Sequence, residues 1–117
     1  MAWELIFYEP LPGKRPVEEF ICSLKPREQA KLIGSLTILE EFGPHIGMPY
    51  VRYLNNDLWE LRTPFGGQSF RVFFFIDANN LVAVHAINKK YAKTPSRDLD
   101  TAMARMKEYK QRKDAVK

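Results

Sequence analysis

The sequence is poor in the residues that build disulfide frameworks and metal centres. It contains one cysteine, Cys22, and two isolated histidines, His45 and His85. A single cysteine excludes an internal disulfide, and neither histidine stands at helical or hairpin spacing with a Cys or acidic partner suited to zinc. We therefore expect no metal and a reducing, cytoplasmic environment. Cys22 lies in an apolar helical pattern, so we expect a buried, inert thiol.

Long apolar runs and nucleotide-binding loops are also missing. No stretch approaches the roughly 20 apolar residues that a membrane span needs. The first eight residues lack the positive start and the long apolar run of a secretion signal. Gly66 and Gly67 are not followed by the Lys and Ser/Thr of a Walker loop. These absences argue against secretion, membrane insertion and a bound nucleotide cofactor.

What the chain does contain suits one domain with a basic end. Its 117 residues are 45% hydrophobic and 13% aromatic, enough for a single core over residues 1–117. The net charge is +4, but residues 88–117 hold 10 Lys and Arg against 4 Asp and Glu. Such a cluster attracts phosphates through its long-ranged field, although a solvated basic tail has the same composition.

Three short apolar runs in the middle of the chain predict an antiparallel sheet. They cover Leu58–Arg62, Phe70–Ile76 and Leu81–Ile87, and the turn signals Thr63–Gly67 and Asp77–Asn80 separate them. Connections this short make neighbouring strands antiparallel. We therefore expect a three-stranded centre for the fold.

Alternation assigns the polar residues of these runs to one face. Glu60 and Arg62 share a face of the first run, and Arg71 shares its face with Phe73 and Phe75. One face is expected to bury apolar residues and the other to present arginines.

The flanking segments predict one more strand and three helices. Residues 3–8 alternate like a strand, Pro16 suits the first position of a short helix, and residues 27–42 carry apolar side chains at helical spacing. Residues 44–50 read as a loop, and residues 51–54 as a strand end or part of a hairpin. The expected class is α+β: a small antiparallel sheet with a mixed edge and an N-terminal helical hairpin.

A C-terminal helix completes this scheme. Thr94 is expected to cap it, with Pro95 at its first position. The apolar stripe comprises Leu99, Ala102, Met103, Met106 and Tyr109. The cations Arg105, Lys107, Lys110 and Arg112 then lie largely outside.

Arg71 is the most informative polar residue, because a cation inside a run of Phe and Val must find a partner or reach solvent. One interpretation is a structural pair with Glu60. The other places Arg62, Arg71, Lys89 and Lys90 around one phosphate, where their charges stabilise a transition state. For His85, a hydrogen-bonded structural role is favoured over proton transfer.

Aromatic residues near these cations suggest contacts with an unpaired base. Tyr53 and Tyr91 could stack on a base of single-stranded RNA, a contact that tolerates any sequence. Any one aromatic residue is more often a packing residue.

The segments Leu58–Arg62, Phe70–Phe74 and His85–Lys90, followed by Thr94-Pro95 and by Ala102 and Arg105, together resemble the toxins of the RelE/ParE superfamily. The similarity is strongest to the HigB-like, phage-derived branch and covers nearly the whole chain. It implies a compact RelE-like α+β fold.

For function, the resemblance implies a type II toxin that cleaves mRNA in the decoding site of the ribosome without a metal. The ribose 2′-OH attacks the adjacent phosphate, so a base, charge stabilisation and protonation of the leaving 5′-oxygen are needed. By position, Arg71 resembles the family's strand arginine, and Arg62 with Lys89 or Lys90 falls where basic residues are common. Lys93 and Arg105 join Tyr53 and Tyr91 as candidate RNA contacts.

The general base stays open at this point. Glu60 is the carboxylate that alternation brings near the arginines, while His85, Tyr91 and a lysine of lowered pKa are alternatives.

The resemblance also implies partners. These are a cognate antitoxin, often of helix-turn-helix type, then the ribosome and mRNA, with operator DNA bound only through the antitoxin. Two other functions fit the same fold: a ParE-like gyrase inhibitor, and a non-catalytic phage-derived RNA- or protein-binding domain.

Overall fold

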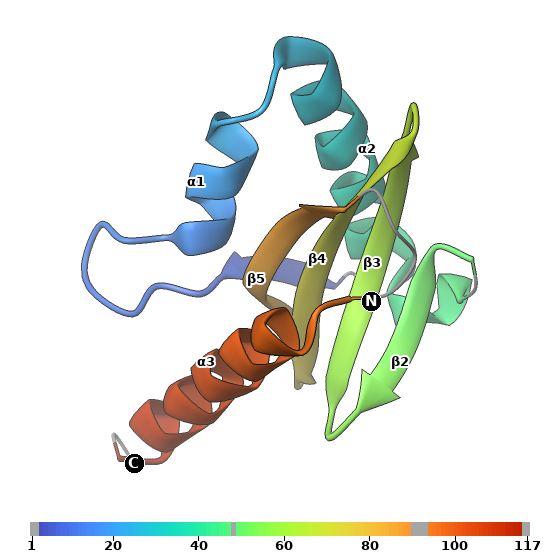
Figure 1. Cartoon of the computed structure of the whole chain (residues 1–117). Coiled ribbons are helices and arrows are strands. Elements are labelled where there is room, and N and C mark those ends of the chain that lie inside the picture. The colour runs from blue at the N-terminus through green and yellow to red at the C-terminus, as the bar shows by residue number, and fades with distance from the viewer. Residues whose placement is uncertain (1–2, 48, 90–93, 116–117) are drawn as a thin grey trace.

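The computed structural model describes residues 3–47, 49–89 and 94–115 (Figure 1). In chain order the elements are β1 (Glu4–Phe7), α1 (Pro16–Cys22), α2 (Pro26–Phe42), the 3-10 helix η1 (Pro44–Ile46), β2 (Val51–Asn55), β3 (Leu58–Phe65), β4 (Gln68–Asp77), β5 (Asn80–Lys89) and α3 (Ser96–Ala115). The α+β class with an N-terminal helical hairpin and a C-terminal helix is confirmed.

The described strands form one five-stranded sheet in the order β1-β5-β4-β3-β2. β2 to β5 are antiparallel neighbours joined by short turns. β1 runs parallel to β5, with Glu4 beside Asn80, and the chain between them contains α1, α2 and the strands β2 to β4. The mixed edge expected from the sequence is therefore the β1–β5 pair.

Both faces of the sheet are buried, and alternation along β4 explains how. Phe70, Val72 and Phe74 pack toward α1 and α2, whereas Phe73 and Phe75 pack toward α3. Figure 1 shows the helical hairpin and α3 on opposite sides of the sheet. Arg62 and Arg71 share one face, as expected, but α3 covers part of that face, so it also buries Phe73 and Phe75.

Some local boundaries also differ from the sequence-based expectations. Thr63–Phe65 continue β3 rather than turn, and only Gly66 and Gly67 form the turn, with φ +62° at Gly66. Residues 51–55 form a strand that pairs with β3 in a hairpin, so the hairpin alternative is the correct one for this segment. Pro64 lies within β3 and is paired with Ser69. Because Pro64 is next to the last residue of the strand, its missing N–H costs little in the hydrogen bonding of the sheet.

Two single residues are also corrected. Cys22 is exposed, because it is the last residue of α1 and follows Ile21 off the buried stripe. Thr94 does not start α3, which begins at Ser96. The Thr94 hydroxyl instead forms hydrogen bonds with Glu60 and Arg71 of the sheet.

An irregularity between β4 and β5 turns His85 toward α3. Phe73 is paired with His85 and Phe74 with Ala83, so Val84 is an extra residue in β5. Val84 and His85 consequently face the same side, and the His85 ring stacks on Phe73. In the described part of the chain, no helix is long and apolar enough to cross a membrane.

Candidate active site

Three basic side chains from neighbouring strands line one cleft. The β3–β4 register places Arg62 opposite Arg71, and the β4–β5 register places Lys89 opposite Ser69. Arg62, Arg71 and Lys89 all border a cleft of about 400 Å³, which Tyr50 also lines. Alternation puts the three cations on one face, and the Gly66–Gly67 turn contributes to the lining of the cleft.

The Glu60 carboxylate lies beneath these arginines and is fully buried. The Arg62 Nε donates to Glu60 Oε1 at 3.1 Å, and the Thr94 hydroxyl donates to Oε2 at 2.9 Å. Arg71 Nη1 lies 3.7 Å from Oε2 and donates to the Thr94 hydroxyl at 2.7 Å. A carboxylate with charged and hydroxyl donors on both oxygens is a firm anchor for the side chains around it.

Burial sets the electrostatics of Arg71. Removal from water lowers the pKa of Arg71, the adjacent Glu60 carboxylate opposes that lowering, and the positive charges of Arg62 and Arg52 add to it. Its side chain is 2% exposed, against 25% for Arg62. Arg62 therefore has much more contact with solvent, whereas Arg71 is a buried part of the lining of the cleft.

The arrangement suits an anion with several oxygens. Two guanidinium groups and one ammonium group surround the cleft, and a guanidinium can hold two phosphate oxygens at once. Glu60 sets the direction of Arg62 and Arg71 through its two oxygens. With no exposed atom, Glu60 is suited to positioning rather than to taking a proton from a substrate.

Two other predicted RNA contacts lie away from this cleft. Tyr53 is paired with Trp59 on the opposite face of the sheet, packs against that ring, and accepts the Asp57 backbone N–H on its hydroxyl. Arg105 turns inward rather than outward and donates to the Val84 carbonyl oxygen. Lys90, Tyr91 and Lys93 lie outside the described residues, so their predicted roles stay predictions.

The surroundings of His85 favour the structural role expected from the sequence. Arg105 lies 3.2 Å from His85 Nδ1 and has only donors, so Nδ1 must accept. The proton then sits on Nε2, which donates to Asp98 Oδ1 at 2.9 Å. Both ring nitrogens are engaged, and His85 ties α3 to β5.

Tyr50 and Thr94 are site residues that the sequence analysis missed. Tyr50 precedes β2, and its backbone carbonyl accepts the Arg62 N–H just beyond the last β2–β3 pair. Alternation along the extended chain could have identified Tyr50. Tyr50 and Tyr53 lie an odd number of residues apart, so their side chains point to opposite sides of that chain. The sequence predicts Thr94 as a helix cap and contains no sign of its contact with Glu60.

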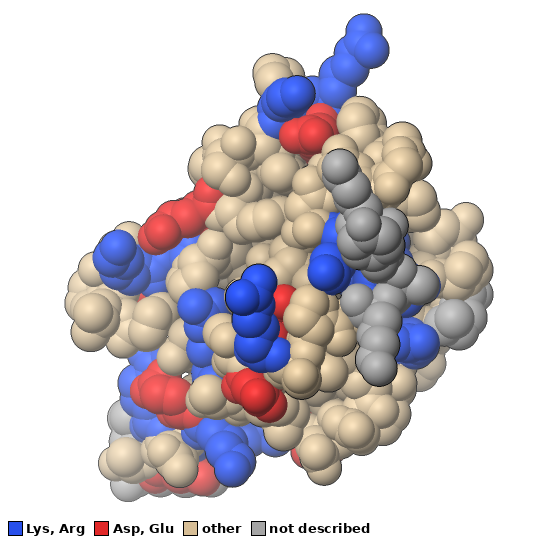
Figure 2. Space-filling view, in the orientation of Figure 1, with Lys and Arg blue, Asp and Glu red and all other residues tan. Residues whose placement is uncertain are grey.

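Figure 2, which views the molecule from the side of α3, shows Lys and Arg side chains spread over this face with Asp and Glu between them. Within residues 3–47, 49–89 and 94–115, no group of three or more His, Cys, Asp and Glu side chains could hold a metal ion.

Comparison with known proteins adds one result. The family described as "Phage derived protein Gp49-like (DUF891)" matches residues 19–107, which is about three quarters of the chain. The matched range includes every described residue of the cleft and Thr94. No curated protein matches the chain.

Proposed function

Because the chain belongs to the Gp49-like family of phage-derived proteins, which is associated with RelE-like toxins, we propose that it is the toxin of a type II toxin–antitoxin system. Its activity is cleavage of mRNA on the ribosome. The observation that carries the proposal is the convergence of Arg62, Arg71 and Lys89 on a single cleft. Three cations in one cleft match a reaction whose transition state gathers negative charge on phosphate oxygens.

The chemistry assigns a task to each group. The ribose 2′-oxygen loses its proton and bonds to phosphorus, while the bond from phosphorus to the 5′-oxygen breaks and that oxygen takes up a proton. Arg62 and Lys89 hold the non-bridging oxygens from the open side of the cleft, and Arg71 adds positive charge from its wall. Glu60 and Thr94 fix the two guanidinium groups before the substrate arrives, so little reorganisation is needed during the reaction.

The partners follow from the same surface. A cleft lined by cations needs an inhibitor that covers it or supplies carboxylates, which is the task of the cognate antitoxin. Helix-turn-helix antitoxins repress their own operon, so operator DNA is bound through the antitoxin. The ribosome delivers the mRNA as substrate.

The test is induced expression in a bacterial host with mapping of mRNA 5′ ends, for the wild type beside Lys89→Ala. We choose Lys89 for replacement, because removing Arg62 or Arg71 would also disturb the buried Glu60 that both contact. The matched control is Lys110→Ala, since Lys110 contacts Asp57 away from the cleft. New ends that follow the reading frame, and fade in Lys89→Ala only, support the proposal.

Two results would overturn it. Growth arrest with a DNA-damage response and no new mRNA ends indicates a gyrase-type protein target. Salt-dependent RNA binding without cleavage, even with ribosomes present, indicates a non-catalytic binding domain.

A further inference from the structure

A second hollow adjoins the basic cleft and shares two residues with it. It has a volume of about 560 Å³ and lies between α2 and the edge of the sheet where β2–β3 pairing ends. Tyr50 and Arg62 line both hollows. We call this second hollow the Tyr50 groove.

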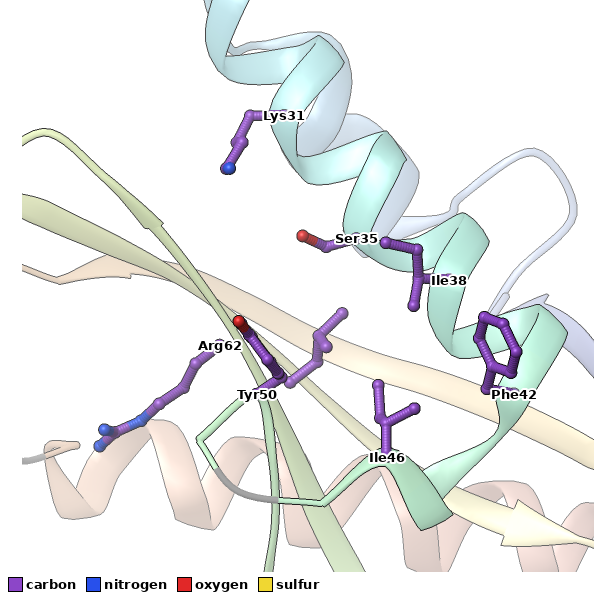
Figure 3. A pocket seen from close by; sticks show the side chains of 8 residues that line it. Lys31, Ser35, Ile38, Phe42, Ile46, Tyr50 and Arg62 are labelled. Atoms are coloured by element: carbon purple, nitrogen blue, oxygen red, sulfur yellow. The ribbon is translucent and has the colours of Figure 1, made fainter.

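The groove is polar toward one end and apolar toward the other. Ile38, Phe42, Ile46 and Leu61 supply apolar surface, and Ile38, Phe42 and Tyr50 are each at least half exposed. Figure 3 shows Tyr50 between Arg62 on one side and the apolar side chains on the other, with Ser35 and Lys31 on the α2 side. An exposed apolar patch beside a charged cleft marks a binding surface.

We propose that the Tyr50 groove receives the nucleobase next to the phosphate held in the cleft, with the Tyr50 ring as its stacking platform. This inference rests on the proposed function, because it assumes an RNA phosphate beside Arg62. It assigns a base contact to Tyr50 rather than to Tyr53, while Tyr91, the other aromatic residue that the sequence suggests, lies outside the described residues.

Continuity between the two hollows favours a nucleotide. A base and its phosphate are joined through one ribose, so a ligand whose phosphate contacts Arg62 brings a base to a neighbouring surface. Tyr50 is the aromatic residue that borders both hollows. Stacking on an aromatic ring tolerates every base, which suits cleavage of many messages.

The polar groups of the groove fit the same ligand. The Ser35 hydroxyl can donate to or accept from a base edge, and Lys31 offers a cation for the next phosphate along the strand. Arg62 and Lys31 both lie toward the end of the groove away from Phe42 and Ile46, so the cations border one part of the groove and the apolar side chains the other (Figure 3). A groove for an aliphatic protein segment would need no second cation beyond its apolar floor.

The test measures the affinity of the purified protein for a short single-stranded RNA by fluorescence anisotropy. Tyr50→Ala is expected to weaken binding by about 5- to 150-fold, the range that loss of one stacked base gives. Tyr50→Phe keeps the ring and should bind like the wild type. Tyr53→Ala is the matched control, because Tyr53 is 48% exposed against 55% for Tyr50 but lines neither hollow.

An RNA with one abasic position sharpens the test. Scanned along the strand, the abasic site should weaken binding to the wild type at one position and have little further effect on Tyr50→Ala. That coupling between one base and one side chain is the signature of stacking. Thermal unfolding of each variant checks that the fold is retained.

Several outcomes separate this inference from the proposed function. If Lys89→Ala weakens RNA binding and a folded Tyr50→Ala binds RNA like the wild type, the inference about the groove is overturned and the proposed function is not. Tyr50→Ala that leaves RNA binding intact but loses neutralisation by a protein partner also overturns it, in favour of a protein-docking groove. A wild type that neither binds RNA nor cleaves mRNA overturns both.

Discussion

Glu60 and Arg71 form an ion pair inside the protein, with Arg71 Nη1 3.7 Å from Glu60 Oε2. The side chain of Arg71 is 2% exposed and that of Glu60 is 0% exposed. Replacing Arg71 alone by Ala leaves a carboxylate in the interior without its closest buried cation. We expect Arg71→Ala to lower the free energy of unfolding by about 3–5 kcal/mol.

The double variant Arg71→Met with Glu60→Leu is the control for this prediction. It removes both charges together and is expected to lose clearly less stability than Arg71→Ala. Urea denaturation monitored by tryptophan fluorescence measures both. If Arg71→Ala unfolds at the wild-type urea concentration, the pair is not a structural element of the core.

The basic cleft predicts the salt dependence of RNA binding. Three cations in contact with phosphates give a slope of log K against log salt of about −2 for a single strand. Lys89→Ala should reduce the magnitude of that slope by about 0.7, and Lys110→Ala should leave it unchanged. Titrations at four or more salt concentrations measure the slope, and a slope near zero for the wild type contradicts phosphate binding in the cleft.

Arg105 distinguishes a structural from an RNA-binding role. It donates to the Val84 carbonyl and to His85 Nδ1, so Arg105→Ala should cost about 1–3 kcal/mol of stability through lost hydrogen bonds. RNA affinity of the folded variant should match the wild type. A stable Arg105→Ala with weakened RNA binding would restore the role expected from the sequence.

Gly43 and Gly66 differ in how strongly the structure requires glycine. Both have positive φ, +76° and +62°, but a Cβ on Gly43 would overlap the Trp3 indole, whereas one on Gly66 meets nothing within 4 Å. Gly66→Ala should cost only about 1–2 kcal/mol of strain at positive φ. Gly43→Ala adds overpacking of about 1–3 kcal/mol, and its ψ of −174° lies in a region that is essentially restricted to glycine. Thermal or urea unfolding ranks the two variants, and equal losses would contradict the prediction.

Tyr8 makes stability fall at high pH. Burial and its hydrogen bond to Glu108 raise the pKa of Tyr8 from 10.0 to about 12. Between pH 10 and 12 the folded chain keeps a proton that the unfolded chain has released, so unfolding becomes easier as the pH rises. Below pH 10 the stabilisation is fully present.

Tyr8→Phe isolates this effect. The pKa of Tyr109 and that of Lys113 are also raised, and both act in the same direction, so the wild-type curve alone does not identify Tyr8. The stability difference between wild type and Tyr8→Phe should shrink from pH 9 to pH 12. A difference that stays constant over that range contradicts the prediction.

The central sheet could be predicted because local pattern and tertiary structure agree. The short connections on either side of the Phe-rich run around Arg71 predicted its two antiparallel neighbours, and period two placed Glu60 and Arg62 on a shared face. Pairing of Arg71 with Glu60 was one of two interpretations, and burial now supports it.

What the sequence could not supply depends on single backbone irregularities and on packing at long range. Counted from Leu81, strict alternation puts His85 on the face of Ala83, but the extra residue Val84 reverses it. α3 covers part of the arginine face from a distant part of the chain, and the contact of Thr94 with Glu60 joins residues 34 positions apart. No local pattern encodes such contacts.

The parallel pairing of β1 with β5 has a consequence for the order of folding. Glu4 meets Asn80, so a loop of more than 70 residues must close before the sheet has its fifth strand. During synthesis β1 emerges first but has no partner strand until β5 has been made, while the β3–β4 and β4–β5 hairpins can form locally. A nascent chain therefore assembles its cation-lined cleft from the two hairpins, and its first strand docks at the end.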